Sequence, residues 1–129
     1  MAQSDVSDLF RALAHVGTVE GVRQEYRVFR GAGGDYVVFS PSSRGSLSYH
    51  MTVVSAEKVD ALYEVMGKSG VTTGSLLKDK RLEDAFGRGD KVAARFDILM
   101  GLYVLSALGK AAMEKEGRNL VFRRTAAEG

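Results

Sequence analysis

Cysteine is absent from this chain of 129 residues, and proline and asparagine occur once each, as Pro41 and Asn119. Without cysteine the chain can form no disulfide, and it has neither a thiolate nucleophile nor a cysteine-based zinc site. Scarce cysteine, asparagine and glutamine, together with 26% charged residues, are typical of thermophile proteins. A GC-rich genome would also produce many Gly, Ala, Arg and Val residues, so the composition favours a thermophile without requiring one.

The charge of the chain is small in total and unevenly distributed. The net charge is +2 and the pI is about 9.0. Residues 1–64 carry six Lys or Arg and eight Asp or Glu, whereas residues 65–129 carry twelve and eight. The basic character therefore lies mainly in the C-terminal half. With 45% hydrophobic residues, the sequence predicts a single folded domain over residues 1–129.

No segment of the sequence has the pattern of a targeting or membrane-spanning element. The N-terminal residues are polar and acidic, which is not the pattern of a signal peptide. The most apolar run, residues 98–108, contains Gly101 and Ser106 and is too short to span a bilayer. We therefore predict a cytoplasmic protein that contacts no membrane.

Few residues offer enzymatic or metal chemistry. The two histidines, His15 and His50, have no metal-ligand spacing with another His, Asp or Glu. The glycine-rich loop at residues 31–34 lacks the Gly-Lys-Ser/Thr ending and the following helix of a phosphate-binding loop. No serine has the surroundings of a nucleophile elbow. The sequence therefore predicts neither an enzyme nor a protein that needs a metal or nucleotide cofactor.

The first residues of the chain predict a helix. An apolar stripe with helical spacing runs from Val6 to Leu13, and Ser4 can cap its start. Gly17 is expected to end this helix.

The next stretch predicts an antiparallel β-meander. Two short runs rich in aromatic and β-branched residues, 26–30 and 35–40, flank the glycine-rich loop at 31–34, which is a hairpin signal. Residues 47–53 then alternate between apolar and polar side chains, as a half-buried strand does. We expect a three-strand meander over residues 20–54.

The rest of the chain predicts a helical part over residues 55–116. One helix follows Ser55, a shorter helical stretch spans residues 72–86, and a long helix spans residues 90–116. Residues 118–124 alternate as a terminal strand does. The expected fold class is α+β: a small antiparallel β-meander packed with four or so helices, in which a long C-terminal helix is followed by a short strand.

The long helix is apolar on every side between residues 98 and 105, so every side must be covered. At a rise of about 1.5 Å per residue, this helix would be some ~40 Å long, more than a small sheet and short helices can cover. We predict a homodimer or homotetramer formed through this helix; the alternative is a central helix buried within one chain. The expected interface residues are Phe96, Leu99, Leu102, Tyr103 and Leu105.

Aromatic side chains stand next to cationic ones on the predicted strands. A single nucleic-acid strand is commonly held in this way, because rings stack on bases while guanidinium groups meet phosphates. The same pattern also fits an ordinary sheet with rings in its core, and strand alternation lets only about half of the side chains face a ligand. The candidate nucleic-acid-binding residues are Tyr26, Arg27, Phe29, Arg30, Tyr36, Phe39, Arg44, Tyr49, His50, Arg118, Phe122, Arg123 and Arg124.

The order of helix, Arg/aromatic meander, short helices and long apolar helix resembles the ThermoDBP-related single-stranded DNA-binding proteins of hyperthermophilic archaea. The residues that carry the resemblance are 26–30, 33–39, 44–54 and the helix from Asp90, and it covers most of the chain. It implies sequence-independent binding of single-stranded DNA, or RNA, in an apolar cleft or intersubunit groove with a basic rim. It also implies self-association through helices, so the expected partners are single strands and other copies of this chain.

Two other functions are open at this stage. Residues 55–124 also resemble a winged helix, with residues 90–116 as recognition helix and residues 118–124 as wing, which would make the chain a transcription regulator of double-stranded DNA. A recognition helix needs a polar face toward the major groove, and residues 98–105 offer almost none. The other alternative is an interaction protein whose arginines only keep its surface soluble.

Overall fold

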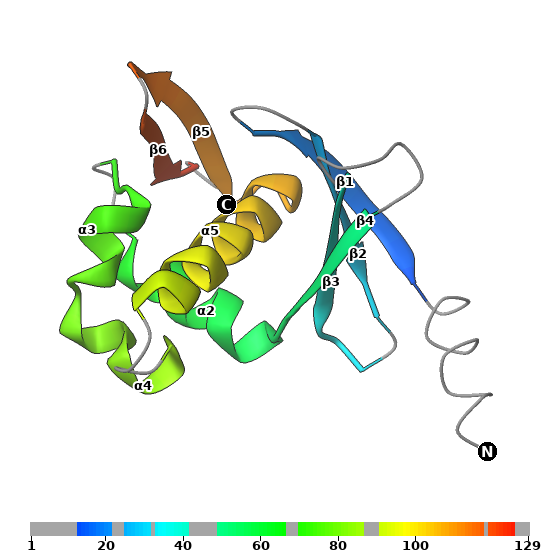
Figure 1. Ribbon diagram of the computed structural model, residues 1–129, viewed down its shortest axis with the longest axis horizontal. Helices are drawn as coiled ribbons and strands as arrows, with labels where there is room; N and C mark the ends of the chain where they lie inside the picture. Colours follow the sequence, from blue (N-terminus) through cyan, green and yellow to red (C-terminus); the bar gives the residue numbers. More distant parts are fainter. Residues whose placement is uncertain are drawn as a thin grey trace.

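The computed structural model describes residues 13–21, 25–31, 33–41, 49–66, 70–86, 91–117 and 119–125. Within these ranges the chain forms a four-stranded sheet, then several helices, then a two-stranded hairpin. The sheet lies on one side of the molecule and the short helices lie on the other. The helix α5 (Lys91–Ala107) runs between them (Figure 1).

The large sheet is an antiparallel meander whose strands lie side by side in chain order. Its strands are β1 (Ala14–Glu20), β2 (Glu25–Arg30), β3 (Tyr36–Pro41) and β4 (Tyr49–Val54). In the loop between β2 and β3, Gly34 has a φ of 95°, a conformation that glycine adopts without strain. The N–H of Gly31 donates to the carbonyl of Asp35 over 2.8 Å, which closes the predicted hairpin.

Two of the described helices begin at side-chain caps. Ser55 precedes α2 (Ala56–Val65), and its Oγ accepts a hydrogen bond of 3.2 Å from the Lys58 N–H. The side chains of Thr72 and Ser75 accept from each other's backbone N–H over 3.0 and 2.9 Å. This capping box starts α3 (Thr73–Leu77). Two further short turns follow, η1 (Lys80–Leu82) and α4 (Glu83–Phe86).

The prediction for residues 14–17 was wrong, because they form the start of a strand and not the end of a helix. In β1, Val19 is buried between the exposed Thr18 and Glu20, which is the alternation of a strand. Pairing with β2 therefore decides the conformation of this segment. The large sheet has four strands instead of the expected three. The rest of the predicted helix lies outside the described residues.

The prediction of one long helix over residues 90–116 was also wrong. The helix α5 ends at Ala107, and β5 (Ala111–Glu116) pairs with β6 (Asn119–Arg124) as a separate antiparallel hairpin. Gly109 and Gly117 have φ values of 79° and 64°, and such left-handed conformations end a helix and turn a hairpin. The terminal strand therefore has a partner of its own and does not join the meander.

The fold is thus α+β, but the expected fold class was wrong in its parts. Four or so helices were expected, but among the described segments only α2 and α5 are longer than five residues. The C-terminal part is a helix followed by a strand pair. None of the described helices combines the length and the apolar character that crossing a bilayer requires.

The helix α5 lies at the centre of the hydrophobic core. From residue 98 to residue 105 every side chain position except Leu99 is buried. The sheet covers one side of α5, while α2, α3 and β5 pack against others. Val71 and Phe122 exchange backbone hydrogen bonds of 2.7 and 2.8 Å, which join the hairpin to the helical part. A single chain therefore covers most of this helix, because the helix is shorter and the sheet larger than expected.

Candidate nucleic-acid interface

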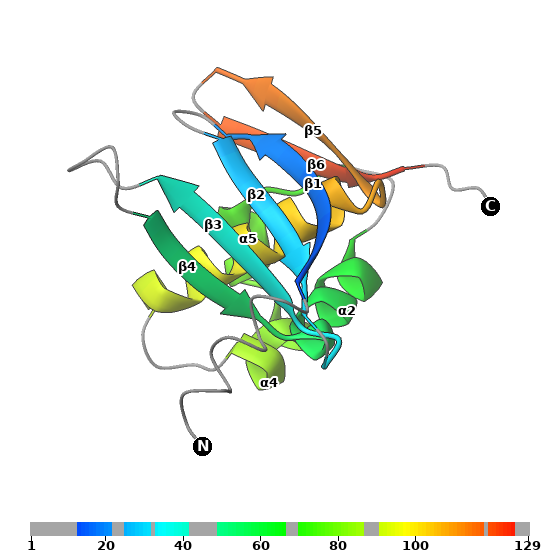
Figure 2. The same ribbon diagram turned by 90° about the vertical axis from the view of Figure 1, so that its right-hand side faces the viewer.

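The large sheet has one face in the core and one face turned away from α5, which we call the outer face. Val28, Val38 and Val54 belong to the core cluster with α5. Side chains alternate along a strand, so the residues between these valines point to the outer face. Figure 2 shows the sheet from this side, with β1 to β4 in front of α5.

Two rows of side chains cross the outer face, one residue from each strand. The strand registers pair the first row as His15, Phe29, Val37 and Val53. They pair the second row as Thr18, Arg27, Phe39 and Met51. Val37 is buried within this face, whereas Met51 and Val53 are 47% and 59% exposed. The outer face is thus largely apolar, with cationic or hydrogen-bonding residues toward β1.

Three rings from three neighbouring strands lie in a row on the outer face, where Phe29 contacts both His15 and Phe39. The centroids of His15 and Phe29 are 5.2 Å apart, and those of Phe29 and Phe39 are 5.5 Å apart. The Thr18 hydroxyl lies 3.4 Å from Nε2 of His15, which holds the imidazole beside Phe29. We call His15, Phe29 and Phe39 the ring cluster. Both Phe rings are partly exposed, so a planar ligand can reach them.

Arg27 places a positive charge next to the ring cluster. It is the register partner of Phe39, and its side chain is 60% exposed. One guanidinium nitrogen lies 3.9 Å from a carboxylate oxygen of Glu25, a long and solvent-exposed ion pair of little strength. Glu25 in turn pairs in register with Glu20. The outer face is therefore acidic at that end, and a phosphate would be held toward Phe29.

Three of the predicted site residues lie on the opposite side of the sheet. Tyr26 stacks on Tyr103 of α5 with a centroid distance of 4.4 Å. Burial, with a smaller contribution from Tyr26, raises the pKa of Tyr103 above that of a free tyrosine. Tyr36 is buried, and the guanidinium of Arg30 lies 5.6 Å from its ring centroid. Tyr26, Arg30 and Tyr36 are thus separated from the ring cluster by the sheet itself.

The predicted site residues of the C-terminal strand have structural contacts of their own. Phe122 is fully buried and meets Tyr103 edge to face. Arg123 forms an ion pair with Glu114 across the hairpin. They lie in the separate hairpin, so they do not extend the outer face of the large sheet.

Arg124 also has a structural role. Its Nε and Nη2 donate hydrogen bonds of 3.1 and 2.8 Å to the carbonyl of Tyr63, and its guanidinium lies 3.9 Å from the Tyr63 ring centroid. These contacts tie the end of β6 to α2. Of the remaining predicted residues, Arg44 and Arg118 lie outside the described residues, as do the side chains of Tyr49 and His50.

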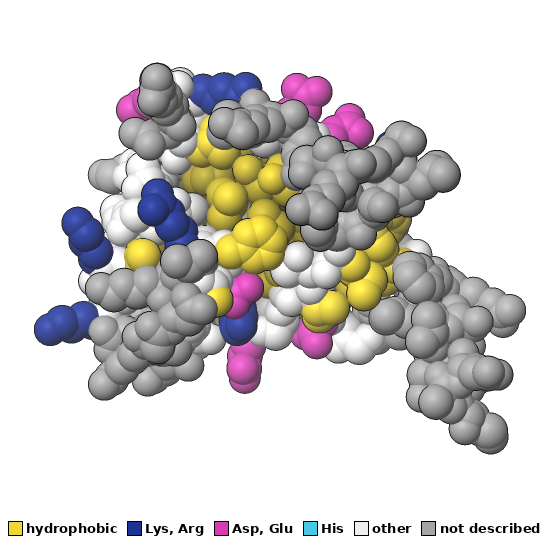
Figure 3. All heavy atoms as spheres, in the orientation of Figure 1, with side chains coloured by type: hydrophobic (Ala, Val, Ile, Leu, Met, Phe, Trp, Pro, Cys, Tyr) yellow, Lys and Arg dark blue, Asp and Glu magenta, His cyan; other side chains and the backbone are white. Residues whose placement is uncertain are grey.

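The residues predicted for an oligomer interface separate into two groups. Leu102, Tyr103 and Leu105 are in the core of the chain and cannot reach a partner. Leu99 is partly buried, and Phe96 is 47% exposed. Figure 3 shows apolar side chains gathered on the side of the molecule where α5 runs.

The buried middle of α5 also leaves no polar face for a recognition helix, which removes the physical basis of the winged-helix alternative.

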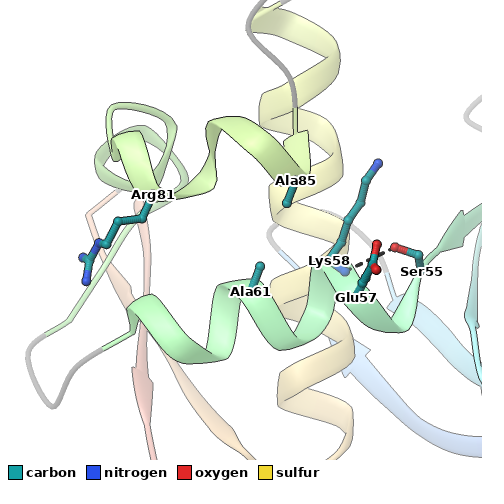
Figure 4. Close-up of a pocket in the computed structure, with 6 residues that line it drawn as sticks. All are labelled: Ser55, Glu57, Lys58, Ala61, Arg81 and Ala85. Carbon is teal, nitrogen blue, oxygen red and sulfur yellow. Dashed lines mark hydrogen bonds between the residues drawn. The ribbon is translucent and has the colours of Figure 1, made fainter.

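A pocket of about 350 Å³ lies between α2 and the segment from η1 to α4, and it is a weaker candidate site (Figure 4). The Arg81 side chain points away from the other lining residues in this view, and its Nη2 is 2.7 Å from a carboxylate oxygen of Asp79. This hydrogen-bonded pair lowers the pKa of Asp79. Lys58 is 3.6 Å from a carboxylate oxygen of Asp97. Both cations are thus paired. The lining residues are Ser55, Glu57, Lys58, Ala61, Arg81 and Ala85.

Within the described part of the chain, no group of three or more His, Asp or Glu side chains is arranged to hold a metal ion. Comparison of the chain with protein-family models, with curated proteins and with solved structures gave no match. The outer face is therefore the strongest candidate site in the described part of the chain.

Sequence reasoning missed three residues of the outer face: His15, Met51 and Val53. His15 was placed at the end of a helix, where it has no ring neighbours. The alternation of residues 47–53 puts Met51 and Val53 on one face of a strand, but it leaves open whether that face is core or an apolar groove for bases. The alternation of side chains along β1 is the signal that could have identified all three. It predicts a strand beside β2, and that strand indicates which residues of the sheet share the outer face.

Proposed function

We propose that this protein binds single-stranded nucleic acid, DNA in the first place, across the outer face of its large sheet. The observation that carries the proposal is the ring cluster, in which Phe29 contacts both His15 and Phe39 across three adjacent strands. Antiparallel sheets with exposed rings on neighbouring strands are a common platform on which unpaired bases stack.

The surroundings of the ring cluster fit a single strand better than a duplex. Met51 and Val53 extend the cluster with exposed apolar surface, which favours the faces of bases over the phosphate-lined exterior of a duplex. Arg27 supplies a cation for the backbone beside Phe39. Few side chains of the two rows can hydrogen-bond base edges, so the expected binding has little sequence preference.

The charge of this face sets the expected strength and salt dependence. Each phosphate contact on a single strand contributes about 0.7 to the slope of log K against log salt. With Arg27 as the main cation of the outer face, the slope should be shallow, and stacking should supply most of the affinity. Binding should therefore persist at salt concentrations that dissociate purely electrostatic complexes.

The test is fluorescence anisotropy of labelled oligonucleotides of equal length, as single-stranded DNA, single-stranded RNA and duplex DNA, across a salt series. Tight binding of single strands with a shallow salt slope is the expected result. The comparison of DNA with RNA identifies the preferred strand. A preference for duplex, or no binding of any oligonucleotide at low salt, would overturn the proposal.

A further inference from the structure

The two edges of the large sheet differ in how well they are protected against pairing with another strand. The edge strand β1 has a register shift between His15 and Gly17 and carries Glu20 at its end. Bulges and charged residues are the usual means by which an edge strand avoids pairing with other chains. In the described part of the chain, β4 pairs only with β3, along all six of its residues and without a register shift.

The edge strand β4 has neither form of protection. Its sequence from Tyr49 to Val54 contains no Asp, Glu, Lys, Arg or Pro, and it includes three β-branched residues in a row. Every second residue of an edge strand directs its backbone N–H and C=O away from the sheet. An uncharged edge of this kind is a template for another strand.

The exposed apolar side chains of the sheet also lie on this edge. Met51 and Val53, 47% and 59% exposed, are two residues apart and lie on the outer face. An exposed edge strand with apolar side chains is a site where another strand is expected to pair. An occupant that adds a strand beside β4 would cover both.

We propose that β4 pairs antiparallel with β4 of a second copy of this chain, about a twofold axis that is perpendicular to the sheet and passes midway between the two Thr52 residues. This axis keeps the outer faces of both copies on the same side of the joined sheet. An outer-face residue can therefore lie opposite only another outer-face residue, and a core-face residue only another core-face residue. Met51 then lies opposite Val53 of the second copy, and Val53 lies opposite Met51. Thr52 lies opposite Thr52, which is a favourable cross-strand pair.

The second copy is the occupant that the charges favour. Antiparallel self-pairing brings identical sequences together, and like charges directly opposite each other would be destabilising. β4 has no charged residue that could repel its own copy. A second copy also covers Met51 and Val53 of both chains in one interface, because Met51 of each copy lies opposite Val53 of the other.

The product is one continuous sheet made from two sheets of four strands each. Its outer face carries the ring clusters of both copies on a single surface. This inference does not depend on the proposed function, since it follows from the edge and from its exposed side chains. If both are right, one DNA strand can contact two ring clusters.

Thiol cross-linking tests the register, because the chain has no cysteine of its own. Thr52→Cys places two thiols opposite each other at a Cα separation of about 4.5–5.5 Å, which suits a disulfide. Thr18→Cys, on the protected edge, is the matched control. Under oxidised glutathione the first variant should become a covalent dimer and the second should stay uncross-linked. Equal cross-linking of both, or none of either, would overturn the register.

Sedimentation velocity over a range of protein concentrations tests the interface itself. The unmodified chain should be a dimer at high concentration, and Val53→Lys should be a monomer with an unchanged circular dichroism spectrum, because the side chain is exposed. Phe96→Glu, on α5, should leave the dimer intact. A monomer at every concentration, or a dimer lost in Phe96→Glu and kept in Val53→Lys, contradicts the proposal. Phe29→Ala should still dimerise, which separates this test from that of nucleic-acid binding.

Discussion

Phe29 and Phe39 meet edge to face on the outer face of the sheet, with their ring centroids 5.5 Å apart and their planes at 87°. Because the planes are nearly perpendicular, a base that stacks flat on one ring lies edge-on to the other. Each ring therefore orients the other. In the proposed site, a base that stacks on one of the two rings would depend on both.

Loss of either ring should weaken single-strand binding. We expect Phe29→Ala and Phe39→Ala each to cost roughly 1–3 kcal/mol in binding free energy. The double variant should lose less than the sum, because contacting residues are coupled. Anisotropy titrations of the four proteins give the double-mutant cycle. Phe96→Ala removes an exposed ring from α5 and should leave the affinity unchanged; an equal loss in this variant would show that the outer face is not the site.

Arg27 should contribute to the salt dependence and not to stacking. Arg27→Gln removes the charge and leaves a shorter polar side chain, so the slope of log K against log salt should fall by about 0.7. Arg95→Gln is the control, because Arg95 is exposed on α5, away from the outer face. Titrations at several salt concentrations measure both slopes. An unchanged slope for Arg27→Gln would mean that Arg27 meets no phosphate.

The alternation along β2 and β3 explains how much of this site could be predicted from the sequence. The aromatic and cationic residues of both strands are evident from composition alone, and the period of two divides them into two faces. Which face is core depends on α5, which begins 50 residues after the end of β3. The choice of Phe29 and Phe39 over Tyr26 and Tyr36 therefore required the structure.

The errors at β1 and β5 have a common physical cause. The helical stripe of residues 6–13 extended the helix prediction into residues 14–17, and Ala111–Glu116 consists of good helix formers. Pairing with β2 and with β6 outweighs these local preferences, which differ by less than about 1 kcal/mol per residue. Long-range pairing of this kind leaves little signal in a single sequence.

Arg124 should affect stability and not binding, contrary to its predicted role. Its guanidinium donates two hydrogen bonds to the Tyr63 carbonyl and lies over the Tyr63 ring. Arg124→Gln should lower the free energy of unfolding by about 1–3 kcal/mol, as expected for charged hydrogen bonds. Urea denaturation measures this change. Arg123→Gln breaks a more exposed ion pair and should cost less than about 1 kcal/mol. A loss of DNA affinity without loss of stability in Arg124→Gln would restore the binding role.

Gly101 permits the close approach of α5 and α2. A Cβ added at Gly101 would overlap the Cδ1 atom of Leu62, a fully buried side chain that would have to shift within the core. Gly101→Ala should therefore destabilise the fold by about 1–3 kcal/mol, although alanine favours a helix by about 1 kcal/mol. Gly74→Ala is the control, since its nearest neighbour would be 3.7 Å away. In thermal unfolding, Gly101→Ala should have a lower midpoint temperature than the parent protein and Gly74→Ala a higher one. A higher midpoint for Gly101→Ala would show that the two helices can separate at no cost.

Tyr103 should make the fold sensitive to alkali. Burial raises the pKa of its hydroxyl above the 10.0 of a free tyrosine, so the folded chain keeps a proton that the unfolded chain releases. The contribution of this group to the free energy of unfolding is fully present below pH 10. Above pH 10 the free energy of unfolding falls by up to about 1.4 kcal/mol per pH unit for one proton. Tyr103→Phe removes the group, so its unfolding free energy should fall less steeply between pH 10 and 11.5. Urea denaturation across this range measures both slopes. Parallel slopes would mean that the Tyr103 hydroxyl reaches solvent in the folded chain.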